Sequence, residues 1–130
     1  MDISKGMLDH YIGYITVFYF NDHELPPDEI TDYYNNVLEL KSDAIRRGDL
    51  DPLRLGIDYL LCNTDINLDS HGGIYPYDDD EVREILRYIR SVIWPDLSNV
   101  NCEEIKDIKL VNTNRFDWWE MRKLEGFSVT

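Results

Sequence analysis

Two stretches of the chain carry apolar residues at three- and four-residue steps, the spacing of an amphipathic helix. The first begins at Pro27, a residue favoured in a first helical turn, and ends at Gly48, which suits a C-cap. The second covers about residues 80–93 and ends before Pro95. Both stretches therefore predict helices. Their expected buried residues are Ile30, Tyr33, Val37, Leu40 and Ala44 in the first, and Val82, Ile85, Leu86, Ile89, Val92 and Ile93 in the second.

The segment 11–20 has a different pattern, with aromatic and β-branched residues on both faces of an extended chain. Such a run is typical of a central strand that is covered on each side. Residues 104–112 alternate imperfectly between apolar and polar positions and also predict a strand. From residue 115 onward the pattern fits one or two further strands, although Gly126 would equally cap a final helical turn.

The segment 52–62 fits two patterns. Its apolar residues alternate as in a strand, yet Leu53, Ile57 and Leu60 also share one face of a helix. Pro52 is well tolerated in a first helical turn, so a short helix is favoured.

The order of these elements sets the expected fold class. Residues 63–80 are rich in Asp, Asn, Ser, Gly and Pro and predict turns rather than a long element. A strand, a long helix, a mixed middle, a second helix and late strands together predict an α+β fold. The expectation is one domain over residues 1–130, with a mostly antiparallel sheet packed with two main amphipathic helices.

Length and composition agree with a single globular domain. The chain has 130 residues, of which 43% are hydrophobic. No apolar run approaches the roughly 18–20 residues that cross a bilayer, and the start has no signal-peptide pattern. We therefore expect a cytoplasmic protein that does not bind membranes. In that compartment Cys62 and Cys102 are expected to be two buried thiols rather than a disulfide. Neither lies at a zinc-ligand spacing, and no cofactor is predicted.

The net charge of the chain limits the classes of partner that it is expected to bind. Twenty-six Asp and Glu residues against 13 Lys and Arg give a formal net charge of −13. Such a chain is repelled by nucleic acid and by anionic membrane surfaces, and it attracts a basic partner. The alternative is that the charge serves solubility alone.

The acids are unevenly spread. No Lys or Arg occurs between Arg54 and Arg83, although seven acids lie there. Helix capping accounts for one or two of the four acids at 78–81, since carboxylates stabilise a helix N-terminus. A surface that receives a cationic protein would use all seven, with neighbouring tyrosines as contact residues. The predicted partner-binding residues are Asp58, Asp65, Asp69, Tyr75, Tyr77, Asp78, Asp79, Asp80 and Glu81.

A metal site is a weaker interpretation of the same region. Asp65, Asn67 and Asp69 alternate like the first ligands of a calcium loop. The loop then fails, because Ser70 stands where Gly is needed and Pro76 where the bidentate Glu is needed. No metal site is predicted, and a regulatory, metal-sensing domain is kept only as an alternative.

Candidate catalytic residues are few. His10, His23 and His71 are the possible near-neutral bases, and no phosphate loop, nucleophile elbow or zinc-protease motif is present. We therefore predict that the protein is not an enzyme. Trp118 and Trp119 would face opposite ways on a strand, which would bury one ring and expose the other as a second contact site.

In general make-up, as a small, acidic, Tyr- and Asp-rich, cofactor-free domain of mixed fold, the chain resembles bacterial toxin immunity proteins, including those of contact-dependent growth inhibition. No diagnostic motif carries this resemblance, so no functional residue is transferred. It implies a protein that binds a cognate toxin domain, commonly a basic nuclease, and covers its active site or substrate groove. The alternative within the same class is a phage-type acidic anti-defence inhibitor or nucleic-acid mimic.

Overall fold

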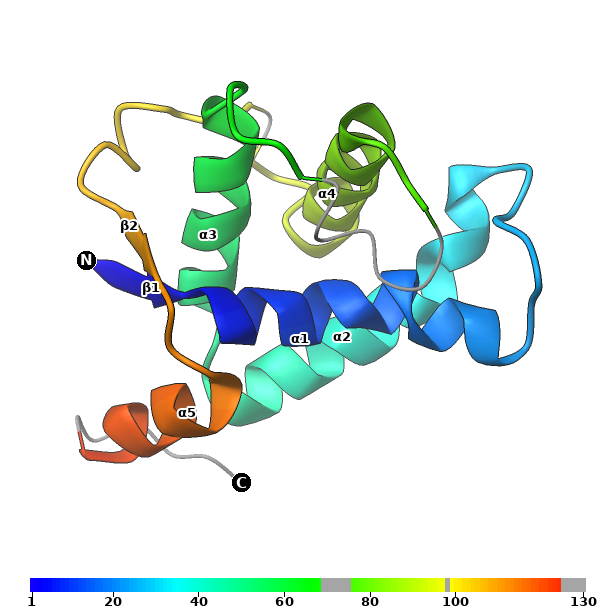
Figure 1. Ribbon diagram of the computed structural model, residues 1–130. Coiled ribbons are helices and arrows are strands. Elements are labelled where there is room, and N and C mark those ends of the chain that lie inside the picture. Colours follow the sequence, from blue (N-terminus) through cyan, green and yellow to red (C-terminus); the bar gives the residue numbers. More distant parts are fainter. Residues whose placement is uncertain (69–75, 98, 125–130) are drawn as a thin grey trace.

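The chain folds mainly into helices, and the computed structural model describes residues 1–68, 76–97 and 99–124 (Figure 1). Within these ranges there are five α-helices, two 3-10 helices and two three-residue strands. The prediction of a mostly antiparallel sheet is therefore wrong. The elements are β1 (Asp2–Ser4), α1 (Lys5–Thr16), η1 (Phe18–Asn21), η2 (Ile30–Tyr33), α2 (Tyr34–Arg47), α3 (Leu50–Cys62), α4 (Asp79–Ile93), β2 (Lys109–Val111) and α5 (Arg115–Leu124).

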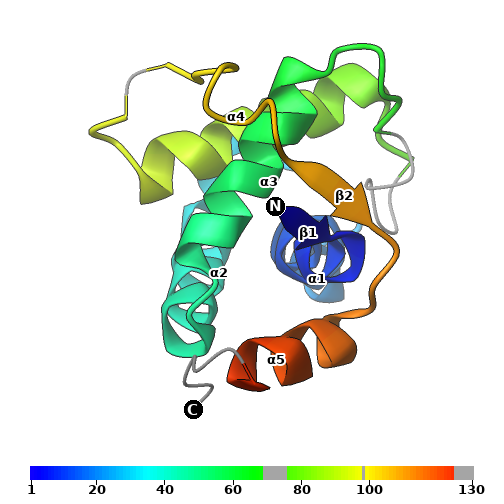
Figure 2. The same ribbon diagram turned by 90° about the vertical axis from the view of Figure 1, so that its left-hand side faces the viewer.

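Helix α1 takes the place of most of the strand predicted at 11–20. Ser4 caps it by accepting a hydrogen bond from the backbone N–H of Met7 at 3.0 Å. The helix packs against α2, α3 and α5, and a helix enclosed in this way is apolar over most of its surface. Figure 2 shows α1 nearly end-on, with these helices around it. Its buried apolar residues recur at helical steps that begin before residue 11: Met7, Leu8, Tyr11, Ile12 and Ile15.

The two strands form a small parallel ladder between distant parts of the chain. Ile3 of β1 lies opposite Leu110 of β2. Parallel strands need a crossover connection, and here helices α1 to α4 supply it. Close by, Gly6 lies so near residues 113–115 that an added Cβ would stand 2.8 Å from their backbone atoms. Only glycine permits this approach between the start of α1 and the start of α5.

The two predicted amphipathic helices are confirmed as α2 and α4, and the preferred helix at 52–62 is confirmed as α3. Gly48 ends α2 in the left-handed conformation, with φ of 71°. The start of α2 was placed too early, because the backbone at Glu29 is extended and residues 30–33 form η2.

Helix α5 replaces the strands predicted after residue 115. Asn114 begins it by accepting a hydrogen bond from the backbone N–H of Asp117 at 2.9 Å, while its amide donates to the Asp117 carboxylate at 3.0 Å. The prediction that one of the two tryptophans is exposed is wrong, because Trp118 and Trp119 are both buried. Neighbouring residues on a helix point only about 100° apart, so both indoles reach the same part of the core.

A disulfide joins Cys62, the last residue of α3, to Cys102, with a Cα–Cα distance of 5.8 Å. The prediction of two free thiols is wrong. The cysteines are 40 positions apart in the sequence, and the sequence pattern did not reveal their approach. Disulfides persist mainly in oxidising compartments, so the bond is evidence against the cytoplasmic expectation, which stays a prediction. No helix in the described part of the chain is long and apolar enough to span a bilayer.

Candidate functional site

The predicted acid run at 78–81 begins helix α4. Asp78 accepts a hydrogen bond from the backbone N–H of Glu81 at 2.8 Å, and the Glu81 carboxylate accepts from the backbone N–H of Asp78 at 3.1 Å. This reciprocal pair is a capping box, which satisfies two otherwise unpaired N–H groups. Both side chains remain exposed, as does Asp80. Capping is thus compatible with contact to a partner.

Asp79 has a structural role. Its carboxylate accepts hydrogen bonds from the backbone N–H of Leu68 at 2.7 Å and from Nε of Arg83 at 2.8 Å. The hydrogen bond from Arg83, followed by that from Leu68, lowers the pKa of Asp79. Arg83 is itself buried and donates to the carbonyls of Leu60 at 2.7 Å and Ile66 at 2.6 Å. The pair therefore ties the end of α3 to the start of α4.

Asp58 is buried, so the prediction that it contacts a partner is wrong. Its side chain is 1% exposed on α3, where it faces α4. Nε of Arg90 lies 2.7 Å from one carboxylate oxygen, and Nη1 of Arg54 lies 3.2 Å from the other. A surface that uses all seven acids of the base-free stretch is therefore wrong, because arginines outside that stretch pair with Asp58 and Asp79.

The remaining predicted residues divide into three groups. Tyr77 is buried, and its hydroxyl is hydrogen-bonded to that of Tyr33, so it packs within its own domain rather than standing free for a partner. Asp65 is exposed in the turn after α3. Asp69 and Tyr75 lie outside the described residues.

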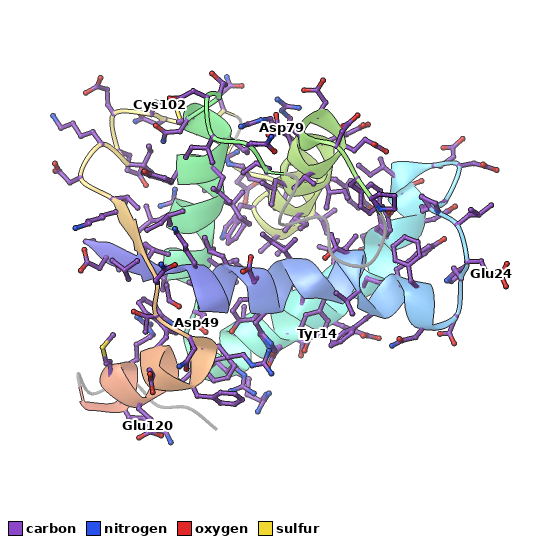
Figure 3. The ribbon with its side chains drawn as sticks, viewed as in Figure 1. Tyr14, Glu24, Asp49, Asp79, Cys102 and Glu120 are labelled. Carbon is purple, nitrogen blue, oxygen red and sulfur yellow. A yellow bond between two sulfur atoms is a disulfide. The ribbon has the colours of Figure 1, made fainter. Side chains whose placement is uncertain are left out.

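The structure joins the start of α4 to a second acidic segment, residues 21–33, which lies at one end of the molecule (Figure 1). Figure 3 places Glu24 of this segment at the opposite end from Cys102. In the described chain none of the exposed carboxylates at this end has an ion-pair partner. We call them the acidic face: Asp22, Glu24, Asp28, Glu29, Asp32, Asp78, Asp80, Glu81 and Glu84.

A groove of about 160 Å³ lies between the two acidic segments. Asp28 borders it on one side and Glu81 and Glu84 border it on the other. Its apolar and aromatic lining is contributed by both segments: Pro26, Pro27, Ile30, Tyr33, Tyr77 and Ile85. The groove therefore offers carboxylates around an apolar surface, which suits a side chain with a hydrocarbon stem and a cationic head.

The electrostatic effect of the acidic face is visible on the tyrosines beside it. Burial, followed by the negative charges of Asp32 and Asp28, raises the pKa of Tyr19. Burial, the hydrogen bond with Tyr77 and the charge of Glu81 raise the pKa of Tyr33. Both phenols therefore stay neutral, and the negative field around the groove comes from its carboxylates.

Six of the nine residues of this face are not among the predicted contact residues: Asp22, Glu24, Asp28, Glu29, Asp32 and Glu84. Asp28 and Glu29 directly follow Pro27 at the predicted start of a helix, where acids stabilise the N-terminus without forming a binding site. A signal was available, because no Lys or Arg occurs between Lys5 and Lys41. All residues of the acidic face except Glu84 come from this base-free stretch or from the one that ends at Arg83.

A second charged cluster surrounds Asp43 of α2 and is largely buried. Its carboxylate contacts Nε2 of His10 at 2.9 Å, the hydroxyl of Tyr14 at 3.0 Å, Nε of Arg47 at 3.0 Å and the guanidinium of Arg46. Burial raises the pKa of Asp43, but the hydrogen bonds from these four groups outweigh it and hold the pKa at about 2. The cluster joins α1 to the end of α2.

This low pKa predicts a pH-dependent contribution of Asp43 to stability. The folded-state pKa lies below the usual value of 3.8, so the contribution is full above about pH 4 and is lost as the pH falls toward 2. Its size is about 2 kcal/mol, from 1.36 kcal/mol per unit of pKa. Urea unfolding of the wild type and of Asp43→Asn should show a stability difference that shrinks by about this amount between pH 6 and pH 2. A difference that stays constant over this range would contradict the assignment.

The histidines in the described residues have structural contacts. Nε2 of His10 contacts the Asp43 carboxylate. Nδ1 of His23 lies 2.9 Å from the carbonyl oxygen of Tyr19, and the His23 ring stacks on the Tyr19 ring. His71 lies outside the described residues. Within the described ranges no group of three His, Cys, Asp or Glu side chains is arranged to hold a metal ion.

Comparison with known proteins gives no relative for this chain. No family model, no curated protein and no solved structure matches it.

Proposed function

We propose that this protein is an inhibitory binding protein whose acidic face docks onto a positively charged partner domain. The observation that carries the proposal is the acidic face itself. Its nine exposed carboxylates have no ion-pair partner among the described residues, and three of them, Asp28, Glu81 and Glu84, border a groove with an apolar lining. Unpaired like charges repel each other, and a cationic partner would relieve that repulsion on binding. Among such proteins, the best fit is an immunity protein that neutralises a bacterial toxin domain, such as a basic nuclease.

Docking would combine two physical effects. The negative field of the acidic face would steer a basic domain and raise the association rate, an effect that salt screens. A Lys or Arg side chain of the partner would then enter the groove, with its stem against Pro27 and Ile30 and its head between Asp28 and Glu84. A nuclease presents such side chains where it binds phosphates, so the inhibitor would cover the substrate site.

The structure changes which residues support the proposal. Asp78, Asp80 and Glu81 remain from the predicted contact set, while Asp58 and Tyr77 are buried. The mixed fold that formed part of the resemblance to immunity proteins is absent as well, since the chain is mainly helical. The proposal now depends on the charge and shape of the acidic face.

Charge reversal on both sides of the groove tests the proposal. We expect Asp28→Lys with Glu84→Lys to slow association with the toxin at least tenfold at low salt and to abolish protection of cells that produce the toxin. Neither side chain caps a helix, so the fold should persist, which circular dichroism checks. The toxin is sought as a basic C-terminal domain encoded beside this gene, and biolayer interferometry measures the rates.

A matched control keeps the net charge equal. Asp2→Lys with Asp107→Lys changes the same number of charges at the end of the molecule that carries β1 and β2. This control should bind normally. If both double variants bind alike, contact is made elsewhere and the acidic face is the wrong surface. Capture of a host nucleic-acid enzyme instead of a toxin would favour the anti-defence alternative.

A further inference from the structure

A cavity of about 470 Å³ lies between the second half of α4 and the Cys62–Cys102 disulfide. This volume is within the range of small-molecule binding sites, which is roughly 300–1,000 Å³. Much of its lining is apolar and comes from the end of α3 and from the segment after α4: Leu61, Trp94, Pro95, Leu97 and Val100. The cavity is built from other residues than the acidic face.

The charge of this cavity is opposite to that of the chain. None of the described Asp or Glu residues lines it, although the chain contains twice as many acids as bases. Two arginines of α4, Arg87 and Arg90, do line it. A cavity that is lined by arginines and by none of the described carboxylates is attractive to anions.

The side chains of the two arginines differ in their ion pairs and hydrogen bonds. Arg90 is 7% exposed and is neutralised by Asp58, with Nε and a carboxylate oxygen 2.7 Å apart. Its guanidinium also donates to the carbonyls of Leu97 at 2.8 Å and Asn99 at 3.3 Å, which fixes the cavity wall. Arg87 is exposed and has no ion-pair or hydrogen-bond partner among the described residues. Its charge is thus available to a ligand.

We propose that this cavity binds a small organic anion, in which a carboxylate is joined to an aromatic or branched aliphatic body. The planar guanidinium of Arg87 would receive the carboxylate through two parallel hydrogen bonds. The body would lie against Trp94, Leu61 and Val100. The site is independent of toxin binding, and each can fail without the other.

The disulfide forms part of the cavity wall. It joins the end of α3 to the segment that carries Val100. Reduction would release this segment from α3, so ligand binding is expected to depend on the oxidised form of the protein.

The test is a titration of the oxidised full chain, followed by two-dimensional amide NMR. The probe is 4-phenylbutyrate, and the matched neutral probe is 4-phenylbutyramide. We expect chemical-shift changes at residues 61–62, 87–97 and 99–102, and at least tenfold weaker binding of the amide. Arg87→Gln should weaken binding of the acid about tenfold, while Arg115→Gln, an exposed arginine on α5, should leave it unchanged.

Several outcomes would overturn the proposal. They are no binding of the acid, equal binding of acid and amide, shift changes elsewhere, or full affinity in a folded Arg87→Gln variant. Because Arg87 is exposed, this variant should keep the wild-type spectrum outside the cavity, so loss of folding will not obscure the result.

Discussion

Replacing Asp49 by Asn is expected to lower the free energy of unfolding by about 3–5 kcal/mol, the cost of removing one partner of a buried ion pair. Asp49 is fully buried where α1, α3 and α5 meet (Figure 3). One carboxylate oxygen accepts from Nε1 of Trp118 at 3.1 Å and lies 3.2 Å from Nε of Arg122. The other accepts from the hydroxyl of Tyr11 at 2.6 Å and from Nε1 of Trp119 at 2.8 Å.

The size of this effect follows from the donors that Asn would leave behind. An amide has the same shape as the carboxylate, but its NH₂ group would face N–H or O–H donors instead of accepting from them. Arg122 would keep a buried positive charge without its counter-charge. Burial, the largest cause, raises the pKa of Tyr11 and persists in the variant, so its hydroxyl stays protonated and cannot adapt by losing a proton.

Urea unfolding followed by tryptophan fluorescence measures this loss, because Trp118 and Trp119 contact Asp49 directly. Asp107→Asn, which changes an exposed aspartate, is the matched control and should stay within about 0.5 kcal/mol of the wild type. Adding Arg122→Met to Asp49→Asn should cost less than the sum of the two single changes. A loss below 1 kcal/mol would show that the buried cluster does not hold α5 in place.

Removal of the disulfide is the second large effect. Cys62→Ser with Cys102→Ser should lower the free energy of unfolding by about 4 kcal/mol, as the loop-entropy relation gives for a separation of 40 residues. The bond restricts the unfolded chain, and its loss frees the long segment that contains α4. Thermal unfolding of the double variant and of the reduced wild type should show the same fall in stability.

Reoxidation is the control for this prediction. The reduced wild type should regain its stability when the bond reforms, whereas the double variant should not respond to oxidant. A protein that is equally stable with and without reductant would contradict a structural role for the bond. In a reducing compartment the chain would have the lower stability, which small domains tolerate poorly.

The candidate site could be predicted only in part. The acids at 78–81 were found from the sequence because a base-free stretch is visible in one dimension. Asp58 lies in the same stretch, yet it is buried against Arg90, a residue 32 positions away. Which carboxylate is neutralised depends on which arginine folds back onto it. The local sequence does not show which arginine pairs with which carboxylate. Nor does it show that residues 26–30 and α4 line one groove.

The strand predicted at 11–20 is wrong because the hydrophobic pattern of helix α1 is weakly periodic. The run at 11–20 looked like a strand because apolar and aromatic residues follow one another without a polar face. The helical spacing becomes clear only when Met7 and Leu8 are included and Ser4 is recognised as the cap. Because three helices surround α1, it needs no polar face, and the periodic signal is correspondingly weak.

By itself, the sequence determined the elements whose signals are local. Helices α2 and α4 have one apolar stripe and one solvated face, with a left-handed Gly48 after the first and Pro95 after the second, so their pattern needs no tertiary contact. Tertiary structure alone decided the disulfide, the burial of Asp49 and Asp58 and the assembly of the acidic face. Each of these joins residues far apart in the chain, and their approach is set by how the helices pack rather than by any neighbouring residues.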